Sequence, residues 1–269
     1  MPTTHFISLN GSRLQSLDEG SGQPLLLLHG GGPAASGGSH WVRNIEPLSA
    51  DFRVIALDFP GFGQSERVPY DGLSASAVNA RAAAGLLEAL GLTQAAVVGY
   101  SMGGSAGFKM AAEYPDRVSH LIALGGGGAS LPSPFGVQPT EGARLLARFT
   151  ADPTRANFDL VWSTFLFDPT LMSQAYLDEM WQAHQSSTQA PISGGPAAPD
   201  NLLPDFPRIQ APTLVVRGRD DRYGPVDQGL SALTLLPNAE LHVYSRCGHW
   251  IQYEKSEGFH TLLRAFINR

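Results

Sequence analysis

The chain has little cysteine, no long hydrophobic run and no cluster of positive charge. Its 269 residues include one cysteine, Cys247, which excludes an intramolecular disulfide and fits a reducing compartment. The longest apolar runs, such as "PLLLLHG" at 24–30, are far too short to span a bilayer. The first residues, "MPTTHFISLNG", lack the charged and apolar regions of a signal peptide. We therefore expect a soluble, cytoplasmic protein.

The charge balance is mildly acidic, with 24 Asp and Glu against 18 Lys and Arg and a net charge of -6. Because no stretch gathers Lys and Arg, neither a nucleic acid nor an anionic membrane is expected as a partner. Hydrophobic residues make up 43% of the chain, enough for one large core, and α/β folds of this length often stay a single unit. The expected partner is a small-molecule substrate, and the sequence leaves open whether the chain forms a homo-oligomer.

Apolar runs alternate with helical patterns along most of the chain. Residues 4–18 read as a hairpin around the Asn10-Gly11 turn. Buried strands are predicted at 24–30, 53–58, 95–100, 120–124 and 213–218, and helices at 76–91, 105–117, 226–238 and 256–269. Strands that are apolar throughout are typical of a parallel sheet covered on both faces. The alternation predicts a doubly wound α/β fold.

Residues 129–206 interrupt this alternation, because they contain no convincing buried strand. Amphipathic segments lie near 141–149, 157–167 and 173–187, and a Pro-rich and Gly-rich loop covers 190–207. We expect a core formed by 1–128 and 207–269, with 129–206 as an all-helical lid over the carboxyl ends of the strands. Open α/β sheets bind their ligands at those ends.

The stretch "VVGYSMGGSAG" at 97–107 places a serine between glycines, after a strand and before a helix. It lacks the Gly-Lys-Ser/Thr of a P-loop and the glycine spacing of a dinucleotide-binding turn. Residues 99–103 instead match G-x-S-x-G, a turn that exposes a strained nucleophilic serine, here Ser101. The motif requires Gly99 and Gly103, because a Cβ at either position would clash with a neighbouring strand or helix. The start of the following helix favours developing negative charge at Ser101.

A nucleophilic serine needs a base and an acid, and in this type of fold they follow it in the order Asp/Glu, then His. His249, in "YSRCGHWIQYEK", lies in a loop after a strand-like segment and before the last helix. The acid lies in "VVRGRDDRYGPVD", directly after a buried strand. Either Asp220 or Asp221 could orient His249 from this loop.

The reaction also needs two N–H donors that stabilise an oxyanion. One is expected from Met102, the residue after the nucleophile. The other is expected from the glycine-rich loop "HGGGPAASGGS" at 29–39, where we assign Gly31, with Gly32 close to the substrate.

These motifs together resemble the α/β-hydrolases over essentially the whole chain. The matching segments are "HGGG", "DFPGFGQSE", "GYSMGG", "GRDDRYGP" and "CGHW", in the family's order. Four longer segments resemble the meta-cleavage product hydrolases within that family: "HGGGPAASGGSHWVRN", "LDFPGFGQSE", "AAEYPDRVSHLIALGGGG" and "SRCGHWIQYEKSEGFHTLLRAFI". Those enzymes split carbon–carbon bonds in vinylogous diketones that ring cleavage of aromatic compounds produces.

The resemblance implies an α/β-hydrolase fold with a helical lid, and neither a metal nor an organic cofactor. It favours Asp221 as the acid of the triad, because an Asp-Arg-x-x-Pro pattern is usual at this corner. The substrate would bind between lid and core. Its binding residues would include Gly32, His40, Tyr100 and Trp250, with Trp250 near the carboxylate-bearing end.

Three positions depart from the pattern of the meta-cleavage product hydrolases. Tyr100 and His40 stand where asparagine is usual, and Met180 stands where the resemblance implies an arginine that binds the substrate's carboxylate. Methionine cannot make the bidentate hydrogen bonds of arginine. The other lid arginines that could supply the charge are Arg144, Arg148 and Arg155.

Three functions follow from these observations. The first is hydrolysis of a carbon–carbon bond in a 2-hydroxy-6-oxo-dienoate through an acyl-enzyme. The second is a carboxylesterase on the same scaffold, acting on a small or aromatic ester. The third is a binding protein without activity. Such proteins usually lose a member of the triad, whereas Ser101, Asp221 and His249 are all present.

Overall fold

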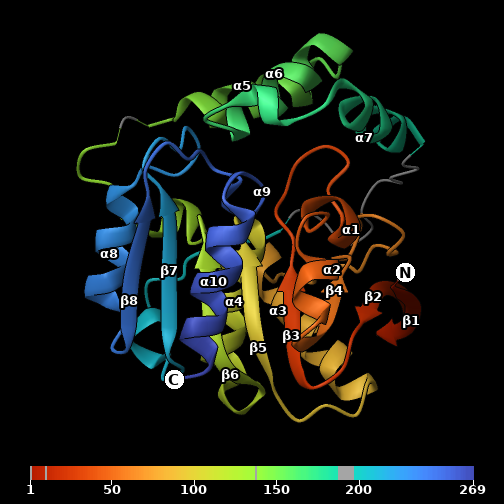
Figure 1. Cartoon of the computed structure of the whole chain (residues 1–269), viewed down its shortest axis with the longest axis vertical. Coiled ribbons are helices and arrows are strands. Elements are labelled where there is room, and N and C mark those ends of the chain that lie inside the picture. Colours follow the sequence, from red (N-terminus) through yellow and green to blue (C-terminus); the bar gives the residue numbers. More distant parts are fainter. Residues whose placement is uncertain (1, 10, 137, 187–196) are drawn as a thin grey trace.

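The chain folds around one eight-stranded sheet in the computed structural model, which describes residues 2–9, 11–136, 138–186 and 197–269 (Figure 1). The strands are β1 (Thr3–Leu9), β2 (Ser12–Glu19), β3 (Gln23–Leu28), β4 (Phe52–Leu57), β5 (Ala95–Tyr100), β6 (Val118–Leu124), β7 (Thr213–Gly218) and β8 (Ala239–Tyr244). Their order is β1-β2-β4-β3-β5-β6-β7-β8. The pairs β1–β2 and β2–β4 are antiparallel, and the other five are parallel. The predicted mostly parallel sheet is confirmed.

Helices cover both faces of this sheet. Those outside the segment between β6 and β7 are α1 (Gly37–His40), α2 (Ile45–Ser49), α3 (Ala75–Ala89), α4 (Met102–Glu113), α8 (Asp227–Leu235), α9 (Ile251–Glu254) and α10 (Ser256–Ile267). One core cluster lies between the sheet and α3, α4 and α8, and the other lies between the sheet and α2 and α10. The short helices α1, α2 and α9 were not predicted, because four or five residues are too few to show a helical period.

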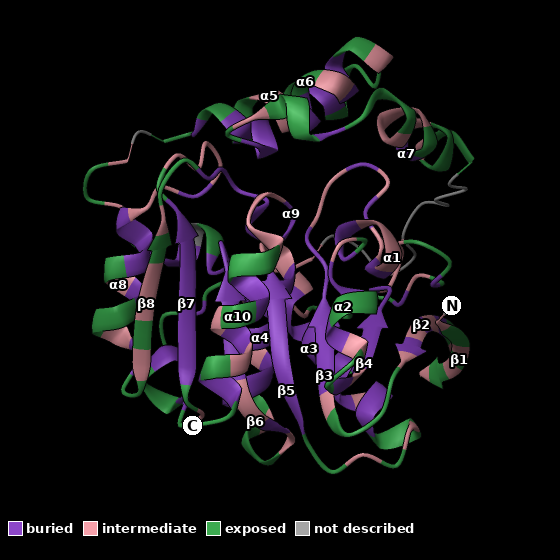
Figure 2. Ribbon diagram, viewed as in Figure 1, coloured by how far each residue is buried: buried purple, intermediate pink, exposed green. Residues whose placement is uncertain are grey.

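The central strands are buried on both faces, as their apolar sequences predict. Every residue of β5 and β7 is buried, whereas the edge strand β8 has no fully buried residue. Figure 2 shows this contrast between the purple central strands and the pink and green edge strand. The apolar run "AAVVGY" is therefore typical of a strand in the middle of the sheet.

The segment between β6 and β7 carries three longer helices, α5 (Glu141–Ala151), α6 (Arg155–Phe165) and α7 (Gln174–Ser186). They agree with the predicted segments to within two residues, whereas the predicted loop at 190–207 lies partly outside the described residues. Thr140 and Thr154 begin α5 and α6, because each side chain accepts a hydrogen bond from an N–H of the first turn. In Figure 1 the three helices form a layer over the carboxyl ends of the parallel strands.

Short 3-10 turns complete the described fold: η1 (Pro115–Arg117), η2 (Gly128–Ser130), η3 (Pro169–Leu171) and η4 (Phe206–Arg208). Among the described residues, no helix is both long and apolar enough to cross a membrane.

The turn between β5 and α4 is packed so tightly that it excludes any side chain at two positions. A Cβ on Gly99 would lie 2.2 Å from the carbonyl oxygen of Gly103, and a Cβ on Gly103 would lie 2.2 Å from the carbonyl oxygen of Leu28. These obstacles are backbone atoms, which cannot rotate away. The clash predicted for both glycines is confirmed.

Gly103→Ala is expected to lower the free energy of unfolding by about 2–3 kcal/mol, because the added methyl group forces β3 and α4 apart. Urea denaturation measures this loss. Gly38→Ala is the matched control, since a Cβ there would meet its nearest atom, Leu17 Cδ1, at an ordinary 3.5 Å. Equal stabilities of the two variants would contradict the steric explanation.

Candidate active site

Ser101 lies between the end of β5 and the first residue of α4, in a strained backbone conformation. Its φ is 52° and its ψ is -114°, values that a residue with a side chain rarely adopts. Its N–H donates to the carbonyl of Leu124 at 2.7 Å, and its own carbonyl accepts from the N–H of Ser105 at 3.1 Å. The helix was predicted from residue 105 but begins at Met102, so Ser101 is the N-cap and faces the positive end of the helix dipole.

A chain of hydrogen bonds joins Ser101, His249 and Asp221. Ser101 Oγ lies 2.9 Å from His249 Nε2, and His249 Nδ1 lies 2.7 Å from Asp221 Oδ2. The side chains of His249 and Asp221 are 4% and 0% exposed, so water does not compete for these bonds. The three residues come from the loops that follow β5, β7 and β8, which end at the same edge of the sheet. The structure therefore brings the predicted serine, acid and base together.

The environment of Asp221 keeps it ionised. Burial alone would raise the pKa of this carboxyl group, but His249 and the N–H groups of Gly224 and Tyr223 outweigh burial and hold the pKa below its usual value. Asp221 Oδ1 accepts from these two N–H groups at 2.9 and 2.7 Å. An ionised Asp221 can only accept a hydrogen bond, so His249 Nδ1 carries the proton and Nε2 is free to accept a hydrogen bond from the Ser101 hydroxyl.

The side chain of the neighbouring Asp220 does not contact His249. Its side chain is 28% exposed and lies 3.4 Å both from an Arg219 guanidinium nitrogen and from the N–H of Cys247. Of the two adjacent aspartates that the sequence left open, Asp221 is therefore the one that reaches His249.

The N–H groups of Gly31 and Met102 are the two expected oxyanion donors. A Cβ on Gly31 would lie 3.8 Å from Met102 Sδ, so the two residues are neighbours beside Ser101. Within the part of the chain that the structure describes, neither N–H donates a hydrogen bond to a protein acceptor. Both can therefore donate to a substrate oxygen at this position.

His29 holds the start of the glycine-rich loop in place. The Phe59 N–H donates to His29 Nε2 at 3.0 Å, and His29 Nδ1 donates to the carbonyl of Gly30 at 2.7 Å. Complete burial lowers the pKa of His29 to about 4, although its hydrogen bond to Gly30 opposes this. The imidazole is therefore neutral and links the loop to the residues after β4.

Three of the four predicted substrate-binding residues are buried next to the nucleophile. His40, Tyr100 and Trp250 are at most 1% exposed. The His40 ring lies 5.3 Å from the Tyr100 ring and 5.4 Å from the Trp250 ring, and the Tyr100 ring lies 5.2 Å from that of His249. The Trp250 indole N–H donates to the His40 carbonyl at 3.3 Å.

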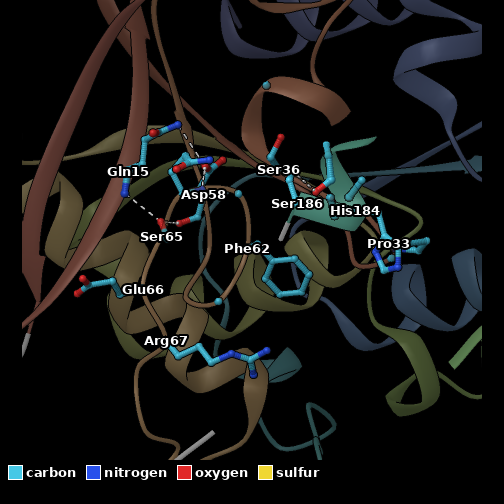
Figure 3. Close-up of a pocket in the computed structure, with 18 of the residues that line it drawn as sticks. Gln15, Pro33, Ser36, Asp58, Phe62, Ser65, Glu66, Arg67, His184 and Ser186 are labelled. Atoms are coloured by element: carbon cyan, nitrogen blue, oxygen red, sulfur yellow. Dashed lines mark hydrogen bonds between the residues drawn. The ribbon is translucent and has the colours of Figure 1, made fainter. Parts of the chain in front are cut away.

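The fourth residue, Gly32, lines a groove with a volume of about 1030 Å³. Figure 3 shows this groove, which is bounded by the glycine-rich loop, the segment 58–69 and residues of α5 and α7. Phe62 and His184 project toward the groove. Asp58 and Gln15 also line it, and Asp58 Oδ2 accepts a hydrogen bond from Gln15 Nε2 at 3.3 Å. Neither Ser101 nor His249 is among the described residues that line the groove.

The arginines of α5 and α6 lie at the protein surface or in ion pairs. Arg155 forms ion pairs with Asp159 at 2.7 Å and Asp178 at 2.6 Å, whereas Arg144 and Arg148 are exposed on α5. Met180 is 3% exposed and belongs to the same hydrophobic cluster as Tyr100 and Trp250.

Sequence reasoning missed the contacts that bind the end of α6 to the loop of His249. The Phe165 carbonyl accepts from the N–H groups of His249 at 2.8 Å and Trp250 at 3.0 Å. Glu254 accepts from the Gly248 N–H at 2.6 Å and from the Phe167 N–H at 2.9 Å. Except for the pair of Gly248 and Glu254, the partners are about 85 residues apart in the sequence. No short sequence pattern could therefore have predicted these hydrogen bonds.

Among the described residues, no three His, Cys, Asp or Glu side chains are gathered so as to hold a metal ion.

Acidification is expected to destabilise the protein through His29. The unfolded chain binds a proton at His29 below pH 6.5, but the folded chain does not until about pH 4. The free energy of unfolding should therefore fall by about 2–3 kcal/mol between pH 6.5 and 4.5 for this group. Urea denaturation of the wild type and of His29→Gln, whose amide does not titrate, measures this. An identical pH dependence in both proteins would contradict the assignment.

Comparisons with known proteins identify the fold and the family of the chain. Residues 23–256 match the family described as the alpha/beta hydrolase fold. The 2-hydroxy-6-oxo-6-phenylhexa-2,4-dienoate hydrolase of Burkholderia cepacia is 37% identical, and the match covers 98% of this chain and 96% of that protein. A 2-hydroxy-6-oxononadienedioate/2-hydroxy-6-oxononatrienedioate hydrolase of Comamonas testosteroni is 38% identical with the same coverage.

Solved structures show the same fold. The meta-cleavage product hydrolase from Pseudomonas fluorescens IP01 superposes with a TM-score of 0.84 at 28% identity, covering 98% of this chain and 97% of that one. The chain belongs to the α/β hydrolase fold family and is a hydrolase that resembles the meta-cleavage product hydrolases within it.

Proposed function

We propose that the protein hydrolyses a carbon–carbon bond in a meta-cleavage product of the 2-hydroxy-6-oxo-dienoate type, through an acyl-enzyme. The observation that carries the proposal is the hydrogen-bonded chain from Ser101 through His249 to Asp221, in a chain similar over nearly its whole length to relatives named for this reaction. The partner is a small molecule, and no part of the proposal requires a metal or an organic cofactor.

Ser101 acts as the nucleophile in the first half of the reaction. Once the dienol of the substrate has tautomerised to a ketone, Ser101 Oγ attacks the carbonyl carbon beside the scissile bond. His249 Nε2, 2.9 Å away, takes the hydroxyl proton. Asp221 holds the ring in the required tautomer and stabilises the imidazolium that forms.

The negative oxygen of the tetrahedral intermediate accepts hydrogen bonds from the N–H groups of Gly31 and Met102. The start of α4 adds the favourable field of the helix dipole. Donors of this kind favour the charged intermediate over the uncharged substrate, which lowers the barrier.

Collapse of the intermediate breaks the carbon–carbon bond and leaves the acyl group on Ser101 Oγ. The electron pair of the broken bond moves onto the dienol fragment, which takes the proton held by His249. Water then attacks the acyl-enzyme while His249 accepts its proton, and the proton returns to Ser101 as the carboxylic acid leaves. We propose that the larger part of the substrate lies in the groove that includes Gly32, the residue next to the expected oxyanion donor Gly31.

A carboxylesterase on the same scaffold is the second candidate. It is favoured by Tyr100, His40 and Met180, which stand where the resemblance implies two asparagines and an arginine. A yellow dienoate and p-nitrophenyl esters, given separately to the purified protein, distinguish the two functions. Fast ester turnover without bleaching of any dienoate would reject the carbon–carbon bond hydrolase.

Ser101→Ala is expected to abolish bleaching of the dienoate by removing the nucleophile, with a loss of at least about 10³-fold in kcat. Its fold should persist, because alanine keeps the backbone of the turn. Absorbance measures turnover, and circular dichroism checks the fold. Substantial residual turnover by a folded variant would identify a different nucleophile.

Asp221→Asn is expected to lower kcat by about 10³–10⁴-fold, since an amide no longer enforces the required tautomer of His249. Asp220→Asn is the matched control at the adjacent position, and its kcat should stay within about threefold of wild type, because Asp220 does not contact His249. A larger loss in Asp220→Asn than in Asp221→Asn would reverse the assignment of the acid.

A further inference from the structure

Arg217 is a fully buried cation in a strand whose other residues carry no charge. It lies in β7, "TLVVRG", and is 0% exposed. Arginine is almost never completely buried unless an acid pairs with it. Among the described residues its hydrogen-bond acceptors are uncharged: Nη2 donates to the Gly126 carbonyl at 2.6 Å and Nη1 to the Gln228 amide oxygen at 3.4 Å, whereas Nε has no acceptor. A buried group of this kind calls for an explanation.

The guanidinium of Arg217 keeps its positive charge at neutral pH. Burial lowers its pKa to about 10, and Asp221 and Asp227 oppose this effect. A buried cation is costly unless a nearby anion offsets the loss of water. Asp227 is engaged at the start of α8, where it accepts hydrogen bonds from the Ser133 hydroxyl at 3.0 Å and the Phe135 N–H at 2.8 Å. The other anion is Asp221, the acid of the triad.

Arg217 and Asp221 approach each other beside Gly224. A Cβ on Gly224 would lie 3.0 Å from Arg217 Nη1 and 3.5 Å from Asp221 Oδ2, so both groups border the same point. Asp221 Oδ2 is also the oxygen that lies 2.7 Å from His249 Nδ1. A positive charge at this range favours the ionised carboxylate and disfavours a second proton on the imidazole beside it.

The other groups around the carboxylate carry no positive charge. Besides the base, the titratable groups that face Asp221 in the described part of the chain are Tyr100, Tyr223 and Cys247. Burial raises the pKa of all three side chains, so each keeps its proton and stays uncharged at neutral pH. The buried positive charge near the acid is therefore that of Arg217.

The same guanidinium holds the glycine-rich loop that follows β6. A Cβ on Gly125 would lie 3.0 Å from His249 Cε1, so this loop lies against the ring of the base. A Cβ on Gly126 would lie 2.7 Å from the Cα of Gly104, in the first turn of α4. The hydrogen bond from Arg217 to the Gly126 carbonyl therefore fixes the loop between the base and the helix that follows the nucleophile.

We infer that Arg217 is a positioning residue of the triad, which fixes the loop after β6 against His249 and places a buried positive charge beside the Asp221 carboxylate. The inference rests on the proposed function, because it takes Ser101, His249 and Asp221 as the reacting groups, and it holds for either candidate substrate. Its consequence is that the triad keeps its reactive form, with His249 neutral and Asp221 ionised, to a lower pH than it would without this charge.

A fluorophosphonate tests the inference without knowledge of the substrate, because it reacts directly with an activated serine. Ser101 Oγ attacks the phosphorus atom, fluoride leaves, and His249 takes the hydroxyl proton. The second-order rate constant of labelling is measured against pH in the full-length protein. The rate falls on the acid side once His249 is protonated, so the position of this acid limb reports the reactive form of the triad.

Arg217→Met removes the charge and keeps an unbranched side chain. The acid limb is expected to move to higher pH by about one unit, because the His249–Asp221 pair then binds a proton more readily. The rate on the plateau should fall about fivefold, the effect of the hydrogen bond that Gly126 loses. Arg217→Lys keeps the charge, and its limb should stay within about 0.3 unit of wild type. An unmoved limb in Arg217→Met, or an equal movement in Arg217→Lys, would overturn the inference.

Arg219→Met is the matched control for the loss of one positive charge. Arg219 lies two residues further along the chain, its side chain is 56% exposed, and it pairs with Asp220 at 3.4 Å. Because water and salt screen an exposed charge, the acid limb of Arg219→Met should stay within about 0.2 unit of wild type. A movement as large as that in Arg217→Met would contradict a specific effect of the buried cation.

A double-variant cycle distinguishes the charge from a purely structural role. Asp221→Asn leaves Arg217 facing an uncharged amide, so adding Arg217→Met should raise the Tm instead of lowering it further. This comparison remains decisive if Arg217→Met alone does not fold, because the double variant lacks both charges. A double variant less stable than Asp221→Asn would count against the inference.

Failure of the proposed function gives a different result. If wild type bleaches no dienoate but the fluorophosphonate labels Ser101, the proposed carbon–carbon bond hydrolysis fails and the test of Arg217 proceeds unchanged. If labelling has the same pH profile in wild type and in Arg217→Met, the role of Arg217 is rejected and the proposed function stands. Absence of labelling in wild type would reject both.

Discussion

The structure around the nucleophile depends on the absence of side chains at Gly99 and Gly103. A Cβ on Gly99 would lie 2.2 Å from the Gly103 carbonyl oxygen, and a Cβ on Gly103 would lie 2.2 Å from the Leu28 carbonyl oxygen. The backbone can pack this closely only because both residues lack a Cβ. The close packing holds Ser101 at a φ of 52° and lets α4 begin directly after it. Packing in the surrounding fold stabilises this strained conformation. Strained residues held in this way are common at active sites.

The lid takes part in positioning the site. The Phe165 carbonyl at the end of α6 accepts hydrogen bonds from the N–H groups of both His249 and Trp250. The Phe165 ring stacks on Tyr223 at 4.3 Å, and the N–H of Tyr223 donates to Asp221. One lid residue therefore contacts the loops of both the base and the acid, so the geometry of the hydrogen-bonded chain depends on how α6 is seated.

Local patterns predicted much of the fold and the main chemistry. Apolar runs located the strands of the sheet, and the glycines around Ser101 identified the turn, because these features depend on neighbours in sequence. The patterns did not predict the short helices, nor the start of α4 at Met102. They could not distinguish Asp220 from Asp221 without the family pattern, because two adjacent carboxylates differ only in where the loop points them.

The order of the motifs by itself determined that a serine, an acid and a histidine follow parallel strands, whose carboxyl ends share one edge of the sheet. Only the tertiary structure decided which groups they meet there. It gave His249 its contacts with Asp221 and with α6, and it left His40 Nε2, the Tyr100 hydroxyl and Trp162 Nε1 without a hydrogen-bond partner among the described residues. The physical reason is that hydrogen bonding and desolvation depend on atoms from distant parts of the chain, which no short stretch of sequence contains.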